Sequence, residues 1–193
     1  YFDTGSVKFG SYVIKNFDGK SNKTQTMTQV LEKSLNTGAV YVERLVGQER
    51  FLEYVQRFGF GEKTGVDFPN EISGNIANLE SGRDLEYATA SFGQGIAVTP
   101  LQMAMALAVI ANGGVMMKPY IVEKITDDAG NERAFGPEKK GEIITKEAAE
   151  ALAKMLISTV RNGYENRAGV TGYFVAGKTG TAQIPLKDRR GYS

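Results

Sequence analysis

The sequence predicts an α/β fold in which a mostly antiparallel sheet is flanked by helices. Residues 100–110 form a long apolar run with a clear helix start, whereas residues 120–126 and 173–184 are apolar runs of strand-like composition. The hydrophobic content of 41% and the charged content of 23% are ordinary for a folded chain of 193 residues. No repeat or linker divides the chain, so we expect one domain over residues 1–193.

The N-terminal part is expected to contain short strands followed by helices. Residues 1–22 are punctuated by glycine, serine and asparagine, which favours small strands and turns. Thr26 or Thr28 is the candidate cap of a first helix that continues to about Lys33.

Two more helices are expected at residues 38–45 and 49–58, and the second of them has an apolar stripe. Gly59 stands where a helix cap belongs, because glycine adopts the left-handed conformation without strain. Residues 59–95 carry many glycine and proline turn signals, so we predict a long loop region there.

The clearest helix start lies at Thr99, because threonine can cap, Pro100 suits the first helical position and Gln102 can close a capping box. The helix is expected to end at residues 112–114. It is apolar on all sides, which predicts that it is buried.

The C-terminal part is predicted to alternate between strands and a helix. Residues 120–126 form a strand, and a turn at residues 127–131 leads to a second one. Thr145 is the candidate cap of a helix over residues 146–161. We expect residues 173–184 to be the last strand, next to a cleft.

The composition excludes several kinds of chemistry. The chain has no histidine and no cysteine, which rules out a Ser-His-Asp triad, a thiol nucleophile and a His/Cys metal cage. We therefore expect no metal and no cofactor, and covalent chemistry would need lysine and hydroxyl groups. The net charge is +1 and no basic stripe is interleaved with aromatic residues, so nucleic acid is not an expected partner.

The run Lys178-Thr179-Gly180-Thr181 has the residue types of an acyl-transfer site. A cation and hydroxyls can hold a substrate carboxylate, and a glycine lets the substrate backbone lie close. A backbone N–H can stabilise the oxyanion that develops during the reaction. Taken alone, the same four residues also fit a surface lysine before a glycine at a strand edge.

Ser34 and Asn36 form a second candidate site, far upstream. A hydroxyl two residues before an amide can point both groups into a cleft, where serine relays a proton and the amide holds a peptide oxygen. The alternative is simple helix termination, since Ser34, Asn36 and Gly38 are typical of a helix end.

A phosphate-binding loop is a competing interpretation, because Gly172 to Thr179 fits the pattern G-x-x-x-x-G-K-[ST]. Such a loop needs a strand before it and a helix after it. The segment after Lys178 does not favour a helix, so nucleotide binding is the weaker hypothesis.

Several sequence blocks together resemble the transpeptidase domain of a class B (monofunctional) penicillin-binding protein. They occur in the family's order and spacing, and the resemblance covers nearly the whole chain. The blocks are Ser34-Leu-Asn36-Thr-Gly38, Phe58-Gly-Phe-Gly61, Thr64-Gly-Val-Asp-Phe-Pro69, Phe92-Gly-Gln-Gly95-Ile-Ala-Val-Thr-Pro100-Leu-Gln102, Ala111-Asn-Gly-Gly114 and Gly177-Lys-Thr-Gly-Thr-Ala-Gln183.

The resemblance implies the penicillin-binding-protein and serine β-lactamase-like fold and a D,D-transpeptidase that cross-links peptidoglycan stem peptides through a serine acyl-enzyme. It implies β-lactam antibiotics as ligands and a location outside the cytoplasm, with the parent protein anchored by an N-terminal membrane helix. A membrane glycosyltransferase and division or elongation proteins are the implied partners of the parent.

The family motifs also imply roles for single residues. Ser34 would assist proton transfer and Asn36 would bind substrate. Lys178 would tune the site and attract the substrate's terminal carboxylate, which Thr179 and Thr181 would bind. The N–H of Thr181 would form half of the oxyanion hole.

One family motif is missing, since no Ser-x-x-Lys, which carries the nucleophile and its base, occurs in the chain. We therefore expect a partial transpeptidase domain that lacks this segment and the C-terminal strands, and that is not acylated by penicillin on its own. The alternatives are a sensor module of the same fold that binds β-lactam or stem peptide without turnover, and a carboxypeptidase or β-lactamase.

Overall fold

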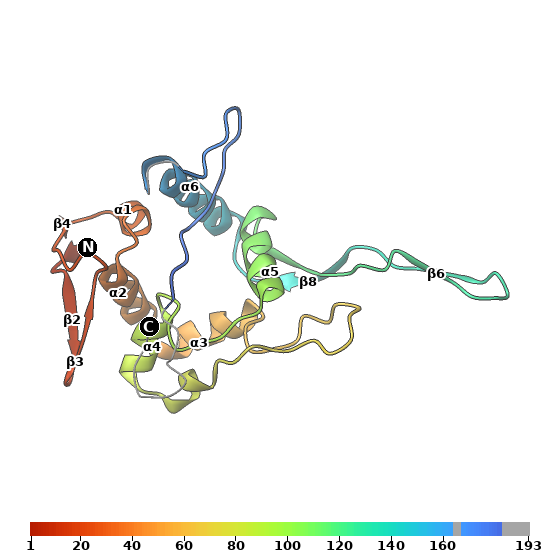
Figure 1. The fold of residues 1–193 in the computed structure, drawn as a ribbon, viewed down its shortest axis with the longest axis horizontal. Coiled ribbons are helices and arrows are strands. Elements are labelled where there is room, and N and C mark those ends of the chain that lie inside the picture. Colours follow the sequence, from red (N-terminus) through yellow and green to blue (C-terminus); the bar gives the residue numbers. More distant parts are fainter. Residues whose placement is uncertain (164–166, 183–193) are drawn as a thin grey trace. The chain divides into compact units, whose positions relative to one another are not determined.

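The computed structural model describes residues 1–163 and 167–182. The chain divides into two compact units that alternate along the sequence. Unit 1 comprises Tyr1–Phe51, Ala77–Ile96 and Lys154–Ser193, and unit 2 comprises Leu52–Ile76 and Ala97–Ala153. Figure 1 shows the course of the chain through its helices and strands.

Unit 1 begins with two short antiparallel strand pairs, as the sequence predicted. Strand β1 (Phe2–Asp3) pairs with β4 (Lys23–Thr24), and β2 (Ser6–Phe9) pairs with β3 (Tyr12–Lys15). Most residues of these strands are exposed or half-buried, whereas Asp3 of β1 and Ile14 of β3 are buried.

The first helix of unit 1 confirms the predicted start signal. Helix α1 (Met27–Glu32) begins at the cap Thr26, whose hydroxyl accepts from the Gln29 N–H while the Gln29 side chain accepts from the Thr26 N–H. Helix α2 (Asn36–Val46) follows after a short turn. The core of unit 1 contains buried side chains from β3, α2 and a later helix, namely Ile14, Val40 and Ala88.

The loop predicted over residues 59–95 is wrong in part, because helix α4 (Asp84–Ala90) and the 3-10 helix η1 (Ala77–Ser81) lie within it. Acidic Asp84 and Glu86 stand in the first turn of α4, where they complement the helix dipole. Tyr87, Ala88 and Ala90 are buried, so packing stabilises a helix too short to show a clear period in the sequence.

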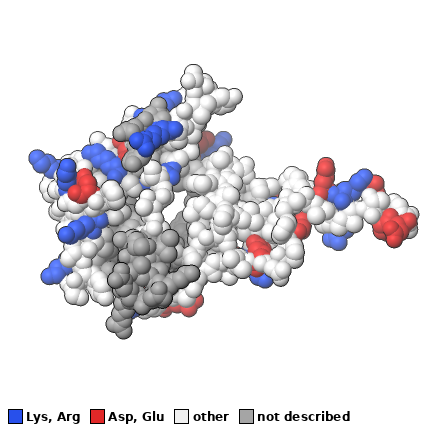
Figure 2. All heavy atoms as spheres, viewed as in Figure 1, with Lys and Arg blue, Asp and Glu red and all other residues white. Residues whose placement is uncertain are grey.

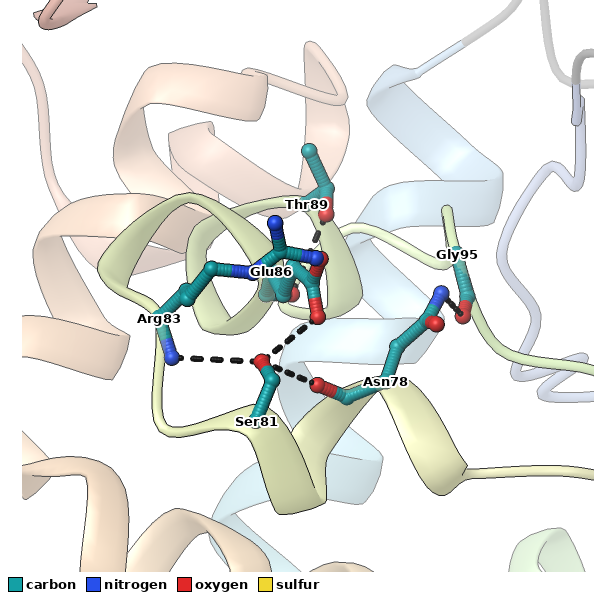
Figure 3. Close-up of polar contacts among 6 residues, drawn as sticks. All are labelled: Asn78, Ser81, Arg83, Glu86, Thr89 and Gly95. Atoms are coloured by element: carbon teal, nitrogen blue, oxygen red, sulfur yellow. Dashed lines mark hydrogen bonds and ion pairs between the residues drawn. The ribbon is translucent and has the colours of Figure 1, made fainter.

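Polar contacts fix the turn between η1 and α4 (Figure 3). The Ser81 hydroxyl lies 2.7 Å from Glu86 Oε2 and 2.8 Å from the Asn78 carbonyl, and Glu86 also pairs with Arg83. The Asn78 amide donates to the Gly95 carbonyl at 2.6 Å. The Ser81 and Glu86 contacts therefore hold the turn, and the Asn78 contact ties η1 to the segment after α4.

Helix α3 (Gln48–Arg57) leads from unit 1 into unit 2, and Gly59 follows it with a φ of 82°. The sequence predicted both this helix and the glycine cap at its end. Arg57 donates to the Ile143 carbonyl at 2.7 Å, which ties the end of α3 to a distant part of unit 2.

Unit 2 is built around helix α5 (Pro100–Ala111), which has the predicted capping box of Thr99 and Gln102. Strand β5 (Val115–Lys118) follows it and pairs antiparallel with β8 (Glu138–Glu142). The core cluster of this unit comes from the helix, the strand and the residue after β8, and consists of Met105, Val109, Met116 and Ile143.

The prediction that α5 is a buried helix is correct only in part, since Met105 and Val109 lie in the core but other apolar side chains do not. Met103 is 42% exposed and Leu107 is 51% exposed, whereas Val109 is fully buried. Helix α5 has its main described neighbour in β5, so only one side of its apolar surface is covered.

The strand predicted over residues 120–126 is shorter in the structure, where β6 (Lys124–Thr126) pairs with β7 (Glu132–Ala134) across the predicted turn. Lys124 and Glu132 form an ion pair at 2.7 Å between them. This hairpin carries both acidic and basic side chains (Figure 2). Helix α6 (Lys146–Asn162) then begins at Thr145, whose hydroxyl accepts from the Ala148 N–H.

The antiparallel pairing of the predicted fold is confirmed, but the described strands form four two-stranded sheets and not one continuous sheet. The strand expected at residues 173–184 is wrong for residues 173–182, and the remaining two lie outside the described residues. A strand requires a paired neighbour, and no described strand pairs with this segment. None of the described helices is long and apolar enough to cross a membrane.

Candidate active site

The structure brings together two of the predicted site residues from opposite ends of unit 1. Lys178 Nζ donates to Ser34 Oγ at 2.7 Å, although 144 positions separate these residues in the sequence. The same ammonium group also donates to Thr179 Oγ1 at 3.0 Å and to the Thr179 carbonyl at 3.2 Å. The ammonium group of Lys178 therefore lies within hydrogen-bond distance of both a serine hydroxyl and a threonine hydroxyl.

The end of helix α1 sets the position of Ser34. The Leu35 N–H donates to the Val30 carbonyl at 3.0 Å and the Ser34 N–H donates to the Leu31 carbonyl at 3.2 Å. These two bonds form a Schellman motif, with Ser34 in the left-handed conformation at a φ of 52°. Leu35 is 5% exposed and turns inward, which leaves the Ser34 hydroxyl outside.

Asn36 lies at the start of α2, two residues after Ser34. Its amide Nδ2 donates to the Lys15 carbonyl of β3 at 2.9 Å. The structure therefore fixes Asn36 against the N-terminal strands, beside the turn that carries Ser34.

Asp3 is a residue that sequence reasoning missed, and it anchors the same turn. Its side chain is fully buried, and Thr37 Oγ1, directly after Asn36, lies 2.8 Å from Asp3 Oδ1. The other donors to Asp3 are the N–H groups of Gly5 and Asn22, the side-chain amides of Asn16 and Asn22, and the Tyr1 hydroxyl. Aspartate two residues before a glycine signals a local turn, but nothing in the sequence signals its long-range donors.

Burial alone would raise the pKa of the Asp3 carboxyl. The hydrogen bonds from Gly5, Asn22 and Thr37 outweigh burial and hold this pKa well below its usual range. Asp3 is therefore a permanent anion at neutral pH, with hydrogen-bond donors around it in place of water.

The environment of Lys178 changes its proton affinity. Although the residue is exposed as a whole, neighbouring atoms displace part of the water around its ammonium group, and this desolvation lowers the pKa of Lys178. A lysine with a lowered pKa, in a hydrogen bond with a hydroxyl, is equipped to exchange a proton with it.

Gly180 and Thr181 follow as exposed residues, and no helix forms over residues 178–182. The strand–loop–helix arrangement that a phosphate-binding loop requires is therefore lacking in the described part of this segment. Within residues 1–163 and 167–182, no group of three or more His, Cys, Asp or Glu side chains is placed to hold a metal ion.

Known proteins with similar sequences include penicillin-binding proteins and peptidoglycan transpeptidases. The family model described as the penicillin binding protein transpeptidase domain matches residues 1–193. Stage V sporulation protein D of Bacillus subtilis is 34% identical over 185 residues, which cover 95% of this chain and 29% of that protein. The peptidoglycan D,D-transpeptidase FtsI of Escherichia coli K12 is 32% identical over 165 residues, which cover 86% of this chain and 26% of that protein.

Solved structures show the same fold. Penicillin binding protein 3 of Mycobacterium tuberculosis, in complex with ampicillin, matches with a TM-score of 0.90 and 29% sequence identity. The match covers 99% of this chain and 44% of that one. This chain thus spans less than a third of the length of the two curated relatives. It belongs to the penicillin-binding protein transpeptidase family.

Proposed function

We propose that these residues form part of a class B peptidoglycan D,D-transpeptidase, which cross-links stem peptides through a serine acyl-enzyme. The observation that carries the proposal is the 2.7 Å contact between Lys178 Nζ and Ser34 Oγ. It joins the two motifs that the family resemblance assigns to the walls of a transpeptidase cleft.

The proton chemistry is assigned to Lys178 and Ser34. In the reaction, a serine attacks the carbonyl of the penultimate D-alanine and D-alanine leaves as the amine. The Ser34 hydroxyl passes its proton to this leaving amine and takes up the proton that the attacking serine loses. Lys178, whose pKa is lowered by desolvation, orients the hydroxyl through its hydrogen bond. An amine from a neighbouring strand then takes up the acyl group.

Substrate binding is assigned to the residues around this pair. The bond from Asn36 Nδ2 to the Lys15 carbonyl uses one of the two amide hydrogens, and we assign the other to the peptide oxygen of the substrate. Thr179 and Thr181 bind the terminal carboxylate, and Gly180 leaves room for the substrate backbone. The N–H of Thr181 contributes to the oxyanion hole, where loss of one donor costs roughly 100- to 1000-fold in rate.

The nucleophile is assigned to a segment outside these 193 residues, because the sequence contains no Ser-x-x-Lys. We further propose that the parent protein acts on the outer side of the cytoplasmic membrane, to which it is anchored. β-Lactams bind it as mimics of the D-alanyl-D-alanine end, and its proposed partners are a membrane glycosyltransferase and division or elongation proteins.

A chimera tests this function. The 193 residues replace the matching segment of a penicillin-binding relative, which keeps its own Ser-x-x-Lys, and the purified chimera is incubated with a fluorescent penicillin. We expect covalent labelling that Lys178→Ala and Ser34→Ala reduce by at least about tenfold, as for loss of a group that assists proton transfer. The exposed Lys139→Ala is the control and retains labelling.

Two results would overturn the proposal. One is a folded chimera, shown by circular dichroism, that remains unlabelled. The other is covalent labelling of the isolated 193-residue chain, because it would place a nucleophile within the chain.

A further inference from the structure

The C-terminal half of helix α6 contacts both of the segments that carry the candidate site. One segment is helix α1, which ends just before Ser34. The other is the run of residues 174–177, which leads directly to Lys178. Each contact joins parts of unit 1 that are far apart in the sequence.

The contact with α1 is centred on Glu32. Its Oε1 atom lies 2.6 Å from Ser158 Oγ and 3.2 Å from Asn162 Nδ2, and both of these groups belong to α6. Asn162 Nδ2 also donates to Ser158 Oγ at 3.0 Å, so the three side chains form a closed set of hydrogen bonds. Glu32 is two residues before Ser34 on a helix of only six residues, so it fixes the end that carries the hydroxyl.

The backbone at the end of α6 approaches α1 just as closely. A Cβ atom placed on Gly163 would lie 2.9 Å from the Glu32 carbonyl oxygen and 2.3 Å from the Thr159 carbonyl oxygen. Only glycine fits this space, so the two helix ends meet without an intervening side chain.

The contact with the Lys178 segment uses neighbouring positions of the same helix. The Gly177 N–H donates to the Leu156 carbonyl at 3.3 Å, and the Arg161 guanidinium lies 4.8 Å from the centre of the Phe174 ring. Gly177 also lies close to Val160, because an added Cβ would be 3.3 Å from its Cγ2 atom. Helix α6 thus supports the residue directly before Lys178.

We infer that Glu32 is a positioning residue, which anchors α1 to α6 through Ser158 and Asn162 and thereby holds Ser34 in contact with Lys178. The geometric part of this inference stands on the hydrogen bonds alone, and its relevance to transpeptidation rests on the proposed function. Displacements of about 1 Å between catalytic groups can cost roughly a hundredfold in rate, so such an anchor acts on catalysis without touching substrate.

The pKa of Lys178 provides the readout. In the full 193-residue chain, lysine is incorporated with ¹³C at Cε, and the Lys178 signal, assigned with Lys178→Arg, is titrated by NMR. We expect Glu32→Ala and Ser158→Ala to raise the pKa of Lys178 toward that of an ordinary lysine, because a displaced Ser34 readmits water to the ammonium group. Loss of the Glu32 charge by itself would lower this pKa, so the two causes have opposite signs.

Two further variants complete the design. Glu32→Gln keeps an oxygen acceptor for Ser158 and Asn162 and removes only the charge, so it is expected to lower the pKa of Lys178 slightly and not to raise it. Lys33→Ala removes a positive charge at the same helix end and measures how far charge alone raises the pKa of Lys178, and the rise in Ser158→Ala should exceed it.

An unchanged pKa of Lys178 in folded Glu32→Ala and Ser158→Ala chains would overturn the inference. If Glu32→Ala fails to fold, as shown by circular dichroism, Ser158→Ala decides, because it removes only a hydroxyl from α6. A Glu32→Gln chain that behaves like Glu32→Ala would also contradict the hydrogen-bond explanation. None of these readouts needs penicillin. An unlabelled chimera would therefore refute the proposed function without deciding whether Glu32 positions Ser34.

Discussion

At the scale of single residues, Ser34 has a backbone conformation that costs stability at a position that the candidate site uses. It occupies the left-handed position of a helix end, where glycine is favoured because it has no Cβ. A serine there costs about 1 kcal/mol of conformational free energy, and such outliers concentrate at functional sites. The hydrogen bond from Lys178 gives this position a use that a glycine could not provide.

Asp3 gives the first residue-scale prediction, a loss of stability in Asp3→Asn. The substitution turns an acceptor surrounded by donors into a group that itself donates, and a buried group left without its partner costs roughly 1–3 kcal/mol. Urea unfolding at pH 7 measures the free energy of unfolding. Asp67→Asn, in which an exposed carboxyl is lost, is the control and should unfold like the parent chain.

The pH dependence of the same pair of chains gives the second prediction. The pKa of Asp3 is lowered in the folded chain, so the unfolded chain binds more protons as the pH falls below the unfolded value of about 3.9. The stability from Asp3 is therefore fully present above that value and is lost as the pH falls toward the folded pKa. Asp3→Asn should have a flatter stability profile below pH 4, and equal slopes for both chains would contradict the assignment.

At the scale of elements, helix α5 shows what a sequence signal contains and what it omits. The capping box of Thr99 and Gln102 was predicted and is present. Gln102 has a second function that its position in the motif does not reveal. It is 1% exposed, and its Nε2 lies within 3.1 Å of three loop carbonyls, those of Gly59, Glu62 and Ser73.

Gln102→Leu is predicted to lower the free energy of unfolding by about 2 kcal/mol or more. The substitution leaves the Gly59, Glu62 and Ser73 carbonyls without their donor, and a buried group without its partner costs roughly 1–3 kcal/mol. Urea unfolding followed by circular dichroism measures the loss. Gln56→Leu, on the exposed side of α3, is the matched control, and an equal effect in both variants would show that the carbonyl contacts are unimportant.

The sequence predicted those elements whose determinants are local. The capping residues Thr26, Thr99 and Thr145 and the helix end before Ser34 all act within about one turn of helix. Residues 173–182 have strand-like composition, yet a strand also needs a neighbour with free hydrogen-bonding groups, which composition cannot supply. The Asp3 donors and the Glu32 contact with α6 were equally inaccessible, because they join residues that only the fold brings together.

At the scale of the whole molecule, residues 1–163 and 167–182 contain two hydrophobic core clusters, which belong to different units. Val40 and Ala88 lie in the core of unit 1, and Val109 and Met116 lie in the core of unit 2. Each unit is assembled from segments that are separated in the sequence, so its stability depends on long-range packing more than on local propensity. Ser34, Asn36 and Lys178 all belong to unit 1, and the candidate site therefore depends on the first core.

This arrangement predicts that the two cores respond separately to truncation. Val109→Ala removes two fully buried methyl groups and should lower the local free energy of opening in unit 2 by about 2 kcal/mol. Native-state hydrogen exchange should then be faster at α5, β5 and β8, with little change at α2 and α4. Val40→Ala is the reciprocal variant and should speed exchange in α2 and α4. It should also raise the pKa of Lys178, because α2 follows the turn that carries Ser34, whereas Val109→Ala should not. Uniformly faster exchange in both variants would show that the chain opens as one cooperative body, and the site would then draw its stability from both cores.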